Sequence, residues 1–417
     1  MVSESHPSLL PVSQVPEWLR TLSASGGPFS AILRASGQDP VDGYRHTIRE
    51  ICQQPATWLE TARRMRDARD QVRASLAGCQ HIVLTGSGSS QYAGECVAPD
   101  LRRRLGLPVD VVGGGSLLLG AGASVAGEPT LVVSLARSGE SPESAAVVER
   151  LLATEPRTTH LILTCNSNGR LAREFAENNR VRVISLSEEV HDRSLVMTSS
   201  FTNLALSARF LGWVDRAEEF AARADRLDAA ARRLLTAGAD RLGTFIAGGI
   251  NRMVFLGDGC RFGAARESAL KLLEMTGGKV ATMAETYLGL RHGPMCFVNE
   301  RTLLVCFLSS DPLIREYERD LITELDAKRL GARKLVVGVG DAVGGLCKGT
   351  DLAISHEFPG QEADDADLVL LDVMIGQILG FYRCREEGLH PDSPSEDGII
   401  SRVVGDFRIH APEVYSK

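Results

Sequence analysis

The sequence has few aromatic residues, no long apolar run and no excess of positive charge. Phe, Trp and Tyr make up 5% of its 417 residues, and the formal net charge at pH 7 is -7. An acidic chain offers no extended basic field for nucleic acid or for an anionic membrane surface. No apolar run approaches the roughly 20 residues that cross a bilayer, and the N-terminus lacks the basic start and apolar core of a signal peptide. We therefore expect a cytoplasmic protein without nucleic-acid or membrane partners.

Motifs for metals, disulfides and nucleotides are also missing. The nine cysteines are scattered without a CxxC pair, and the nine histidines show no HExxH or paired-ligand spacing. Reduced thiols and no metal are expected. The segment GSGSS at residues 86–90 departs from the GxGxxG spacing, and no Walker lysine follows it, which argues against dinucleotides and nucleoside triphosphates. We expect no cofactor.

The length of the chain indicates two domains with some additional segments. Residues 1–43 are rich in Pro, Ser and Gly and are expected to form a loosely structured lead-in. A helical pattern follows, in which Pro55 is expected to begin a new helix. We place a first domain at 44–217, a second at 218–386, and a tail that wraps over the surface at 387–417.

Apolar, β-branched segments alternate with helical patterns in both halves of the chain. This alternation is typical of an α/β fold, in which a parallel sheet is covered by helices on both faces. The segments begin in the first half at His81, Thr130, Leu161 and Val181, and in the second half at Arg252, Thr302, Lys334 and Asp351. Because they match in the same order at a near-constant offset, we interpret them as a duplicated domain.

Two loops of the first half are rich in hydroxyl groups. Each follows a predicted strand and leads into a helix, and they contain Ser87, Ser89 and Ser90, and Arg137, Ser138 and Ser141. Free N–H groups and the dipole at a helix N-terminus favour an anion, and parallel sheets bind ligands at the carboxyl ends of their strands. The two loops together predict a phosphate site, although GSGSS alone could equally form N-caps without a ligand.

The corresponding loops of the second half are less suited to an anion. They read DGCR and SSDPL, so that Asp258 and Asp311 would repel a phosphate. We therefore expect one phosphate site, in the first domain.

A charged stripe marks the predicted helix that begins near Arg266. At about 100° per residue, Glu267, Lys271 and Glu274 fall on one side. The opposite side is expected to pack through Ala265, Ala269, Leu272 and Leu273. Glycines at 277 and 278 end this helix, and a second short helix is expected to end at His292. Taken alone, the stripe favours a solvated helix with a Glu–Lys pair.

Several motifs together resemble those of a known family. TGSGSS, LARSGES, and ESALKLLE followed by RHGP resemble the sugar isomerase (SIS) domains of phosphosugar isomerases and of glucosamine-6-phosphate synthase. ARSGESPES, HTIREICQQPATW, GLHPDSP and SRVVGDFRIH look like segments of the tagatose-6-phosphate ketose/aldose isomerase-like proteins, which are regarded as galactosamine-6-phosphate deaminases. The resemblance extends from about Tyr44 onward. It implies two tandem SIS domains, each a flavodoxin-like parallel sheet flanked by helices on both faces.

The resemblance also implies roles for individual residues. It places the phosphate of a small sugar phosphate on Ser89, Ser90, Arg137, Ser138 and Ser141. It makes Glu274 the catalytic base, with Glu267 and Lys271 as its partners. It makes His292 the ring-opening residue, which in relatives reaches the neighbouring subunit and so implies a homodimer or a larger homo-oligomer with shared active sites. Ala136 and Arg137 depart from the serine and glutamine of the synthase pattern.

The chemistry suits these residue types. A histidine that titrates near neutral pH can open the sugar ring, and a partly desolvated Glu274 can move a proton from C2 to C1. Lys271 can stabilise the oxyanion or enolamine charge.

The predicted reaction converts galactosamine 6-phosphate to tagatose 6-phosphate and ammonia by ring opening, proton transfer and imine hydrolysis. The chain opens with Met1-Val2, so we do not expect the amidotransferase domain that supplies the synthase with ammonia. The alternatives are a glucosamine-6-phosphate deaminase, an isomerase of tagatose 6-phosphate that releases no ammonia, and a non-catalytic sugar-phosphate-binding regulator. The segment His191-Asp192-Arg193 is equally a structural loop or a lid, and Arg402 either approaches the substrate or lies on the surface.

Overall fold

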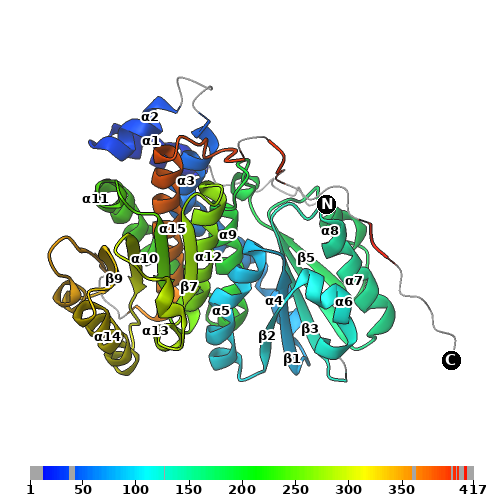
Figure 1. Ribbon diagram of the computed structural model, residues 1–417. Coiled ribbons are helices and arrows are strands. Elements are labelled where there is room, and N and C mark those ends of the chain that lie inside the picture. Colours follow the sequence, from blue (N-terminus) through cyan, green and yellow to red (C-terminus); the bar gives the residue numbers. More distant parts are fainter. Residues whose placement is uncertain are drawn as a thin grey trace.

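The computed structural model describes residues 13–36, 43–125, 127–358, 363–395, 398–400, 402 and 408–410. Two five-stranded parallel sheets, each flanked by helices, occupy the two halves of the molecule (Figure 1). The first has the order β2-β1-β3-β4-β5, built from β1 (His81–Gly86), β2 (Val109–Gly113), β3 (Thr130–Ala136), β4 (Thr158–Thr164) and β5 (Val181–Ser185). The second has the order β10-β9-β8-β6-β7, built from β6 (Arg252–Leu256), β7 (Ala281–Glu285), β8 (Thr302–Phe307), β9 (Arg333–Val339) and β10 (Leu352–His356).

Both sheets have the same strand order when each is numbered along its own half of the chain. The loops after their first strands also match, since Gly88 has φ 58° and ψ -126° and Gly259 has φ 56° and ψ -126°. This left-handed conformation favours glycine because a Cβ atom would be strained there. The predicted α/β fold of two tandem domains, and all eight predicted strands, are confirmed.

The helices around the first sheet are α5 (Ser89–Leu105), α6 (Gly114–Val125), α7 (Pro142–Thr154), α8 (Arg170–Glu174) and α9 (Ser199–Arg209). Those around the second are α12 (Cys260–Met275), α13 (Tyr287–Leu290), α14 (Pro312–Ala327) and α15 (Asp365–Glu386). Along the chain, α10 (Ala217–Arg233) and α11 (Ala239–Ile246) follow the elements of the first sheet and precede those of the second. Shorter helical turns are η2 (Glu188–Val190), η3 (Phe210–Arg216), η4 (Leu234–Gly238), η5 (Pro294–Phe297) and η6 (Asp341–Leu346). None of the helices described combines the length and apolar character needed to cross a membrane.

The sequence did not predict two of the strands, β2 and β7, and both lie at the edge of a sheet. β2 and β7 each pair with a single neighbour, β1 and β6 respectively. β7 occupies part of the segment that was expected to form a helix ending at His292, and the helix actually present there, α13, covers only Tyr287–Leu290. Ala, Met and Glu in Ala281–Glu285 favour a helix locally, and pairing with β6 overrides that weak preference.

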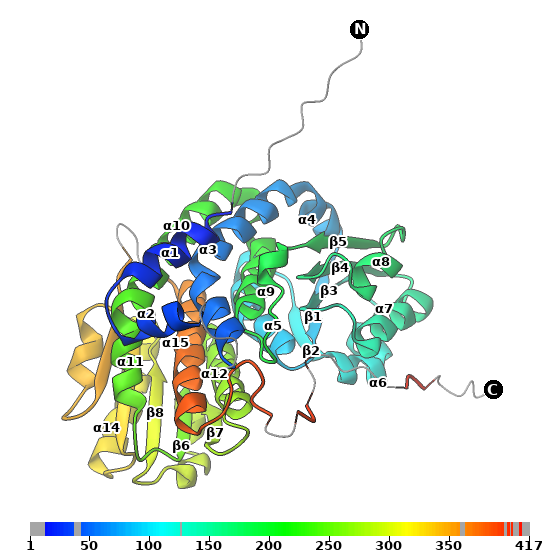
Figure 2. The same ribbon diagram turned by 90° about the horizontal axis from the view of Figure 1, so that it is seen from above.

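The N-terminal segment is more ordered than the sequence indicates. It forms α1 (Val15–Ala24) and α2 (Pro28–Ala35), which lie across α3 (Arg45–Asp67) and α11 (Figure 2). Buried side chains such as Trp18 and Phe29 anchor them, and the indole N–H of Trp18 donates to the carbonyl of Cys52 at 2.7 Å. The expectation of a loosely structured lead-in is therefore wrong for these residues, because the proline-rich composition hides two short amphipathic helices.

The helix α3 also differs from its prediction. Pro55 lies inside α3, which continues to Asp67 before α4 (Arg69–Leu76) begins. A proline within a helix removes one N–H donor and strains the preceding turn. Burial of the face that contains Ile48, Ile51 and Trp58 offsets this cost.

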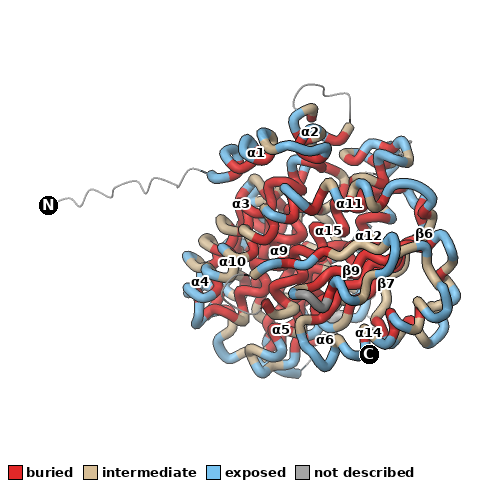
Figure 3. Tube along the Cα trace, turned by 90° about the vertical axis from the view of Figure 1, so that its left-hand side faces the viewer, coloured by how far each residue is buried: buried red, intermediate tan, exposed pale blue. Residues whose placement is uncertain are grey.

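The domains join through helix packing around α12. Cys96 of α5 lies against Gly263 of α12, where an added Cβ would come within 2.6 Å of the backbone nitrogen of Cys96. On its other side α12 packs on α15, where an added Cβ at Gly376 would come within 2.2 Å of the Ser268 hydroxyl. Figure 3 shows this central region largely as buried tube. A helix of the second domain is therefore enclosed between α5 and α15.

Candidate active site

The loop between β1 and α5 forms a tight turn at the carboxyl edge of the first sheet. Gly88 enables the turn, and α5 begins directly after it with the buried residues Ser89 and Ser90. Gly86 also has to be glycine, since a Cβ there would come within 2.6 Å of the Cβ of Ser90. The hydroxyl groups of α5 are thus held at the start of a helix, where free N–H groups favour an anion.

A second loop lies beside it, because β1 and β3 are neighbours in the sheet. It leads from Arg137 to Ser141, the N-cap of α7. Asn166 fixes its backbone by donating its side-chain amide to the Ser138 carbonyl at 2.9 Å. The structure therefore brings the predicted phosphate loops together at one sheet edge, and both end at a helix N-terminus.

The charged stripe of α12 reaches the first of these loops. The Lys271 ammonium donates to the Ser89 hydroxyl at 3.0 Å and to the Glu274 carboxylate, and it lies 3.4 Å from a carboxyl oxygen of Glu267. The side chains of Glu267 and Lys271 are fully buried, whereas that of Glu274 is 33% exposed. The solvated surface helix is therefore excluded, because the charged side of α12 faces the protein interior.

One member of the face that was expected to pack does not pack. Leu273 is 45% exposed, whereas Leu272 beside it is fully buried. The sides of α12 that pack differ from the predicted side, because α5 covers the charged side of the helix and α15 covers a second side.

Burial controls the protonation of this cluster. It raises the pKa of Glu267 to about 8, with Lys271 acting in the opposite direction and Glu274 reinforcing the rise. Burial by itself would lower the pKa of Lys271, but Glu267 and Glu274 more than offset this, and the net shift is upward. At neutral pH we therefore expect a largely protonated Glu267 behind an ion pair of Lys271 and Glu274.

Arg137 occupies the rim of the same site. Its guanidinium donates to the backbone carbonyls of Leu195 at 2.9 Å and Arg402 at 2.7 Å. Burial lowers the pKa of Arg137, and the charge of Glu274 is near enough to act on it. The structure thus places Arg137 near Glu274 with donors bound to the protein, so its contact with phosphate stays a prediction.

The segment after β5 is held as a structural loop. Asp192 is buried and accepts hydrogen bonds at 2.8 Å from the backbone N–H groups of Thr198 and Ser200. The Arg402 guanidinium donates to the Asp192 carbonyl. Arg402 therefore ties the tail to the loop that contacts Arg137.

Glu50 is a residue of this region that the sequence did not reveal. Its carboxyl group accepts hydrogen bonds from the backbone N–H of Arg193 at 2.5 Å and of Ser194 at 3.2 Å. Burial, together with the charge of Asp192, raises the pKa of Glu50 to about 8. Glu50 lies more than 140 positions before its partners, so no local pattern could identify it.

Glu143 is a second residue that was missed. Its carboxylate accepts a hydrogen bond at 2.8 Å from Ser87, so it joins the start of α7 to the β1–α5 loop. A Cβ atom at Gly114 would lie 2.7 Å from this carboxylate, so the β2–α6 connection approaches it closely. The motif ARSGESPES contains Glu143 and was the available signal.

The loop between β8 and α14 corresponds in the second domain to the loop between β3 and α7, and its backbone N–H groups already bind carboxylates. The N–H of Ser309 donates to Glu318 at 2.9 Å, and the N–H of Ser310 donates to Asp365 at 2.6 Å. Asp311 caps α14 by accepting from Leu313 at 2.8 Å. These N–H groups have protein partners in place of an anion, which supports the prediction of a single phosphate site.

His292 lies apart from the cluster on α12. It is exposed, and among the described residues no hydrogen bond or ion pair joins it to Glu267, Lys271 or Glu274. The structure of one chain therefore does not assemble all the predicted catalytic residues.

The described residues provide neither a cluster of metal ligands nor a disulfide bond. No group of three or more His, Cys, Asp or Glu side chains could hold a metal ion in the described ranges. All nine cysteines are free thiols.

Known proteins are similar to this chain along most of its length. The SIS domain family model matches residues 75–211. A Streptomyces coelicolor protein provisionally named D-galactosamine-6-phosphate deaminase AgaS is 39% identical over 386 residues, which cover 90% of this chain and 98% of that protein. The D-galactosamine-6-phosphate deaminase AgaS of Escherichia coli is 32% identical over 372 residues, covering 87% and 95% respectively.

A solved structure agrees with these relatives. The crystal structure of a Clostridium novyi NT protein, provisionally named tagatose-6-phosphate ketose/aldose isomerase, matches with a TM-score of 0.85 and 30% identity. The match covers 93% of this chain and all of that one. The chain therefore belongs to the AgaS family of SIS-domain enzymes.

Proposed function

We propose that the protein is a deaminase of an amino-sugar 6-phosphate, with galactosamine 6-phosphate as substrate and tagatose 6-phosphate and ammonia as products. The observation that supports it most directly is the Lys271–Glu274 ion pair on α12, which is partly buried and hydrogen-bonded through Lys271 to Ser89 of the first hydroxyl-rich loop. An acid–base pair thus adjoins a loop suited to phosphate. The names of the AgaS relatives support the choice of substrate.

In the proposed mechanism the phosphate binds at the N-termini of α5 and α7. The hydroxyl groups of Ser90, Ser138 and Ser141 and the free N–H groups of both helices would hold its oxygens. This fixes the open-chain sugar with C1 and C2 toward α12. Ser89, which bonds Lys271, aligns the ammonium with the sugar.

Glu274 then moves the proton. Its carboxylate is partly exposed and paired with Lys271, so it can take a proton from C2 and return it to C1. Lys271 stabilises the negative charge that develops on the substrate oxygen. Glu267, which is protonated, adds no second negative charge beside the Lys271 ammonium, so the positive charge of Lys271 stays available to the substrate. Water adds to the resulting C2 imine, the C–N bond breaks, and ammonia leaves with the ketose.

We also propose that two or more copies assemble and share their active sites. His292 is exposed and lacks a bond to the α12 cluster of its own chain, so it is free to serve ring opening in a neighbouring copy. Exposed apolar side chains on the elements nearby, Leu288 of α13 and Leu313 and Tyr317 of α14, would suit such a contact. The nine free thiols fit a reducing compartment, and we place the reaction in the cytoplasm.

The test is to incubate purified protein with galactosamine 6-phosphate and, separately, with glucosamine 6-phosphate, and to measure ammonia and ketose phosphate. We expect ammonia and tagatose 6-phosphate in equal amounts from the first substrate. Ammonia from the gluco epimer alone would reassign the substrate. Interconversion of tagatose 6-phosphate with an aldose phosphate without ammonia would favour the isomerase, the activity in the name of the Clostridium protein. No turnover of any of these would reject the proposal.

A further inference from the structure

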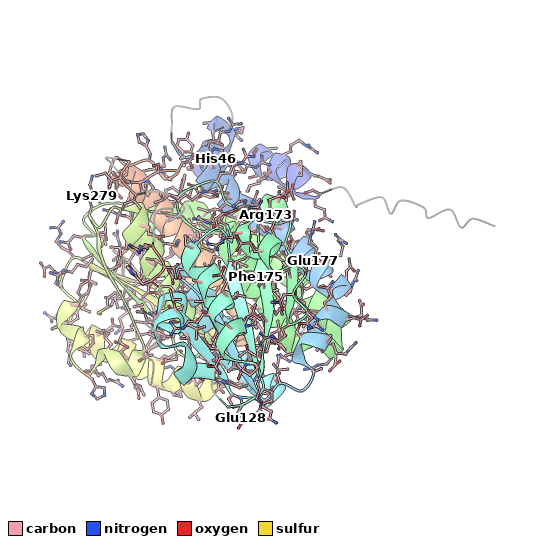
Figure 4. The ribbon with its side chains drawn as sticks, turned by 90° about the vertical axis from the view of Figure 1, so that its right-hand side faces the viewer. His46, Glu128, Arg173, Phe175, Glu177 and Lys279 are labelled. Atoms are coloured by element: carbon pink, nitrogen blue, oxygen red, sulfur yellow. The ribbon has the colours of Figure 1, made fainter. Side chains whose placement is uncertain are left out.

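Two adjoining hollows lie at the N-terminal end of α3, outside the site on α12. One has a volume of 540 Å³ and is bordered by α1, α2 and α3, and the other has a volume of 380 Å³ and is bordered by α3 and the segment after β5. Arg45 and Arg49 line both hollows. His46, labelled in Figure 4, marks their position at the first turn of α3.

The hollows contain arginines without partners. Arg20 lines the larger hollow, Arg193 lines the smaller one, and Arg45 and Arg49 line both. Across the described part of the chain, none of these four guanidinium groups forms an ion pair or a hydrogen bond. By contrast, the buried Arg209 pairs with Asp100 and Asp367, and the buried Arg261 pairs with Asp372. Four unpaired guanidinium groups thus line the two hollows, although the chain as a whole has a net charge of -7.

The acidic groups of the smaller hollow are largely engaged elsewhere. The Glu189 carboxylate accepts from the Ser13 hydroxyl at 2.8 Å, and Glu50 points to the N–H groups of the Arg193–Ser194 segment. Glu188 is exposed at the rim. His191 also lines this hollow, and its Nε2 is buried without a hydrogen-bond partner. The three arginines of this hollow, Arg45, Arg49 and Arg193, therefore outnumber Glu188 and Glu189, the two carboxylates that are not bonded to backbone N–H groups, as an anion site requires.

The larger hollow supplies an apolar wall beside these donors. Pro16, Leu19 and Leu33 line it. An inorganic anion gains no binding energy from apolar side chains, whereas a phosphorylated organic molecule could pack its carbon skeleton against them.

We propose that these two adjoining hollows together bind a small phosphate monoester, with its phosphate between Arg45, Arg49 and Arg193 and its organic part against Leu19 and Leu33. Arginine suits this role because its planar fork donates two hydrogen bonds to a phosphate. The site is separate from the phosphate loops at α5 and α7, and it rests on no part of the proposed deaminase activity.

The position of the site links it to the active site. Arg193 is hydrogen-bonded to Glu50 through its backbone, and Leu195, two residues later, accepts from Arg137 at the rim of the catalytic cluster. A ligand that holds the Arg193 side chain would therefore restrain the same loop that positions Arg137.

Equilibrium dialysis with radiolabelled orthophosphate tests the proposal. The full-length wild-type protein is compared with R45Q/R49Q and R49Q, whose substituted side chains are exposed and have no partner to lose. The matched control is R173Q, because Arg173 of α8 is also exposed and lines neither hollow (Figure 4). We expect R45Q/R49Q to bind one phosphate fewer per chain than wild type. R49Q should raise the dissociation constant of that site about tenfold, as for one lost charge-assisted hydrogen bond.

Competition identifies the ligand. Displacement by a hexose 6-phosphate at lower concentration than by unlabelled orthophosphate would identify the organic ester as the occupant, and equal displacement would identify free phosphate. Equal stoichiometry and affinity in wild type and R45Q/R49Q would overturn the proposal, as would an equal loss in R173Q. Absence of deaminase activity would leave this comparison intact, so the two proposals fail separately.

Discussion

The ammonium group of Lys271 lies 3.0 Å from the hydroxyl group of Ser89, and so joins the second domain to the first loop of the first domain. The two residues belong to helices of different domains, α12 and α5. Neither domain alone contains both the phosphate loops and the acid–base pair. A catalytic role for the site thus depends on the packing of α5 against α12.

Replacement of Lys271 with methionine should remove activity while keeping the fold. The straight side chain fills the same buried space, Glu267 stays largely protonated, and Glu274 can reach solvent. We expect kcat for ammonia release to fall at least about 100-fold, as for loss of one preorganised charge. K328M is the control, since Lys328 is an exposed lysine paired with Glu324 on α14. Wild-type kcat in K271M would exclude Lys271 from the reaction.

Glu274 to Gln separates chemistry from binding. Gln keeps the size and the polarity but cannot take a proton, so kcat should fall by about 100- to 10,000-fold, the range for a lost general base. KM should change little, because the phosphate loops are untouched. E324Q provides a surface control of the same chemistry. A variant with unchanged kcat would show that another group transfers the proton.

The stripe on α12 illustrates what the sequence can and cannot determine. Its periodicity correctly placed Glu267, Lys271 and Glu274 on one side, because helix geometry is local. The prediction that the stripe taken alone faces solvent was wrong, because Ser89, which contacts Lys271, lies 182 positions earlier in the chain. The exposure of Leu273 was missed for the same reason.

The strands show a similar limit. β3 and β8 are buried throughout and consist mostly of apolar residues, so composition identifies them. β2 contains the exposed Asp110 and is only partly buried, because it has a neighbour on one side only. Glu50 and Glu143, which hold the site loops, depend on contacts that only the folded chain creates.

The stability of the protein should depend on the protonation of Glu267. Its pKa in the folded protein is about 8, above the ordinary value of 4.5, so the folded state holds a proton that the unfolded state releases between these values. This contribution to stability is therefore complete below about pH 4.5 and is lost as the pH rises through 8. Between pH 5 and 8, the free energy of unfolding of wild type should fall more than that of E267Q. Denaturant titrations at both pH values measure this difference, and parallel losses would contradict the assignment.

Removal of Glu50 should weaken substrate binding from a distance. Glu50→Ala frees the N–H groups of Arg193 and Ser194, which fix the loop that holds Arg137. We expect KM to rise about tenfold with a smaller change in kcat. Glu50→Gln should restore KM, because its amide oxygen can accept the same hydrogen bonds. If KM is unchanged in E50A, this loop does not position Arg137 for the substrate.

The contact between the domains can be tested at Gly263. A Cβ atom there would lie 2.6 Å from the backbone nitrogen of Cys96 and 2.9 Å from its sulfur, so α5 and α12 would have to separate. Although alanine favours a helix more than glycine does, we expect Gly263→Ala to lower the free energy of unfolding by about 1–3 kcal/mol, as for other overpacked cores. Separation of the helices would also lengthen the Lys271–Ser89 contact, so kcat should fall together with stability. Gly345→Ala is the control, because a Cβ there meets no atom within 4 Å. Equal stability and kcat in both variants would mean that the two helices tolerate a wider spacing than the site on α12 is proposed to require.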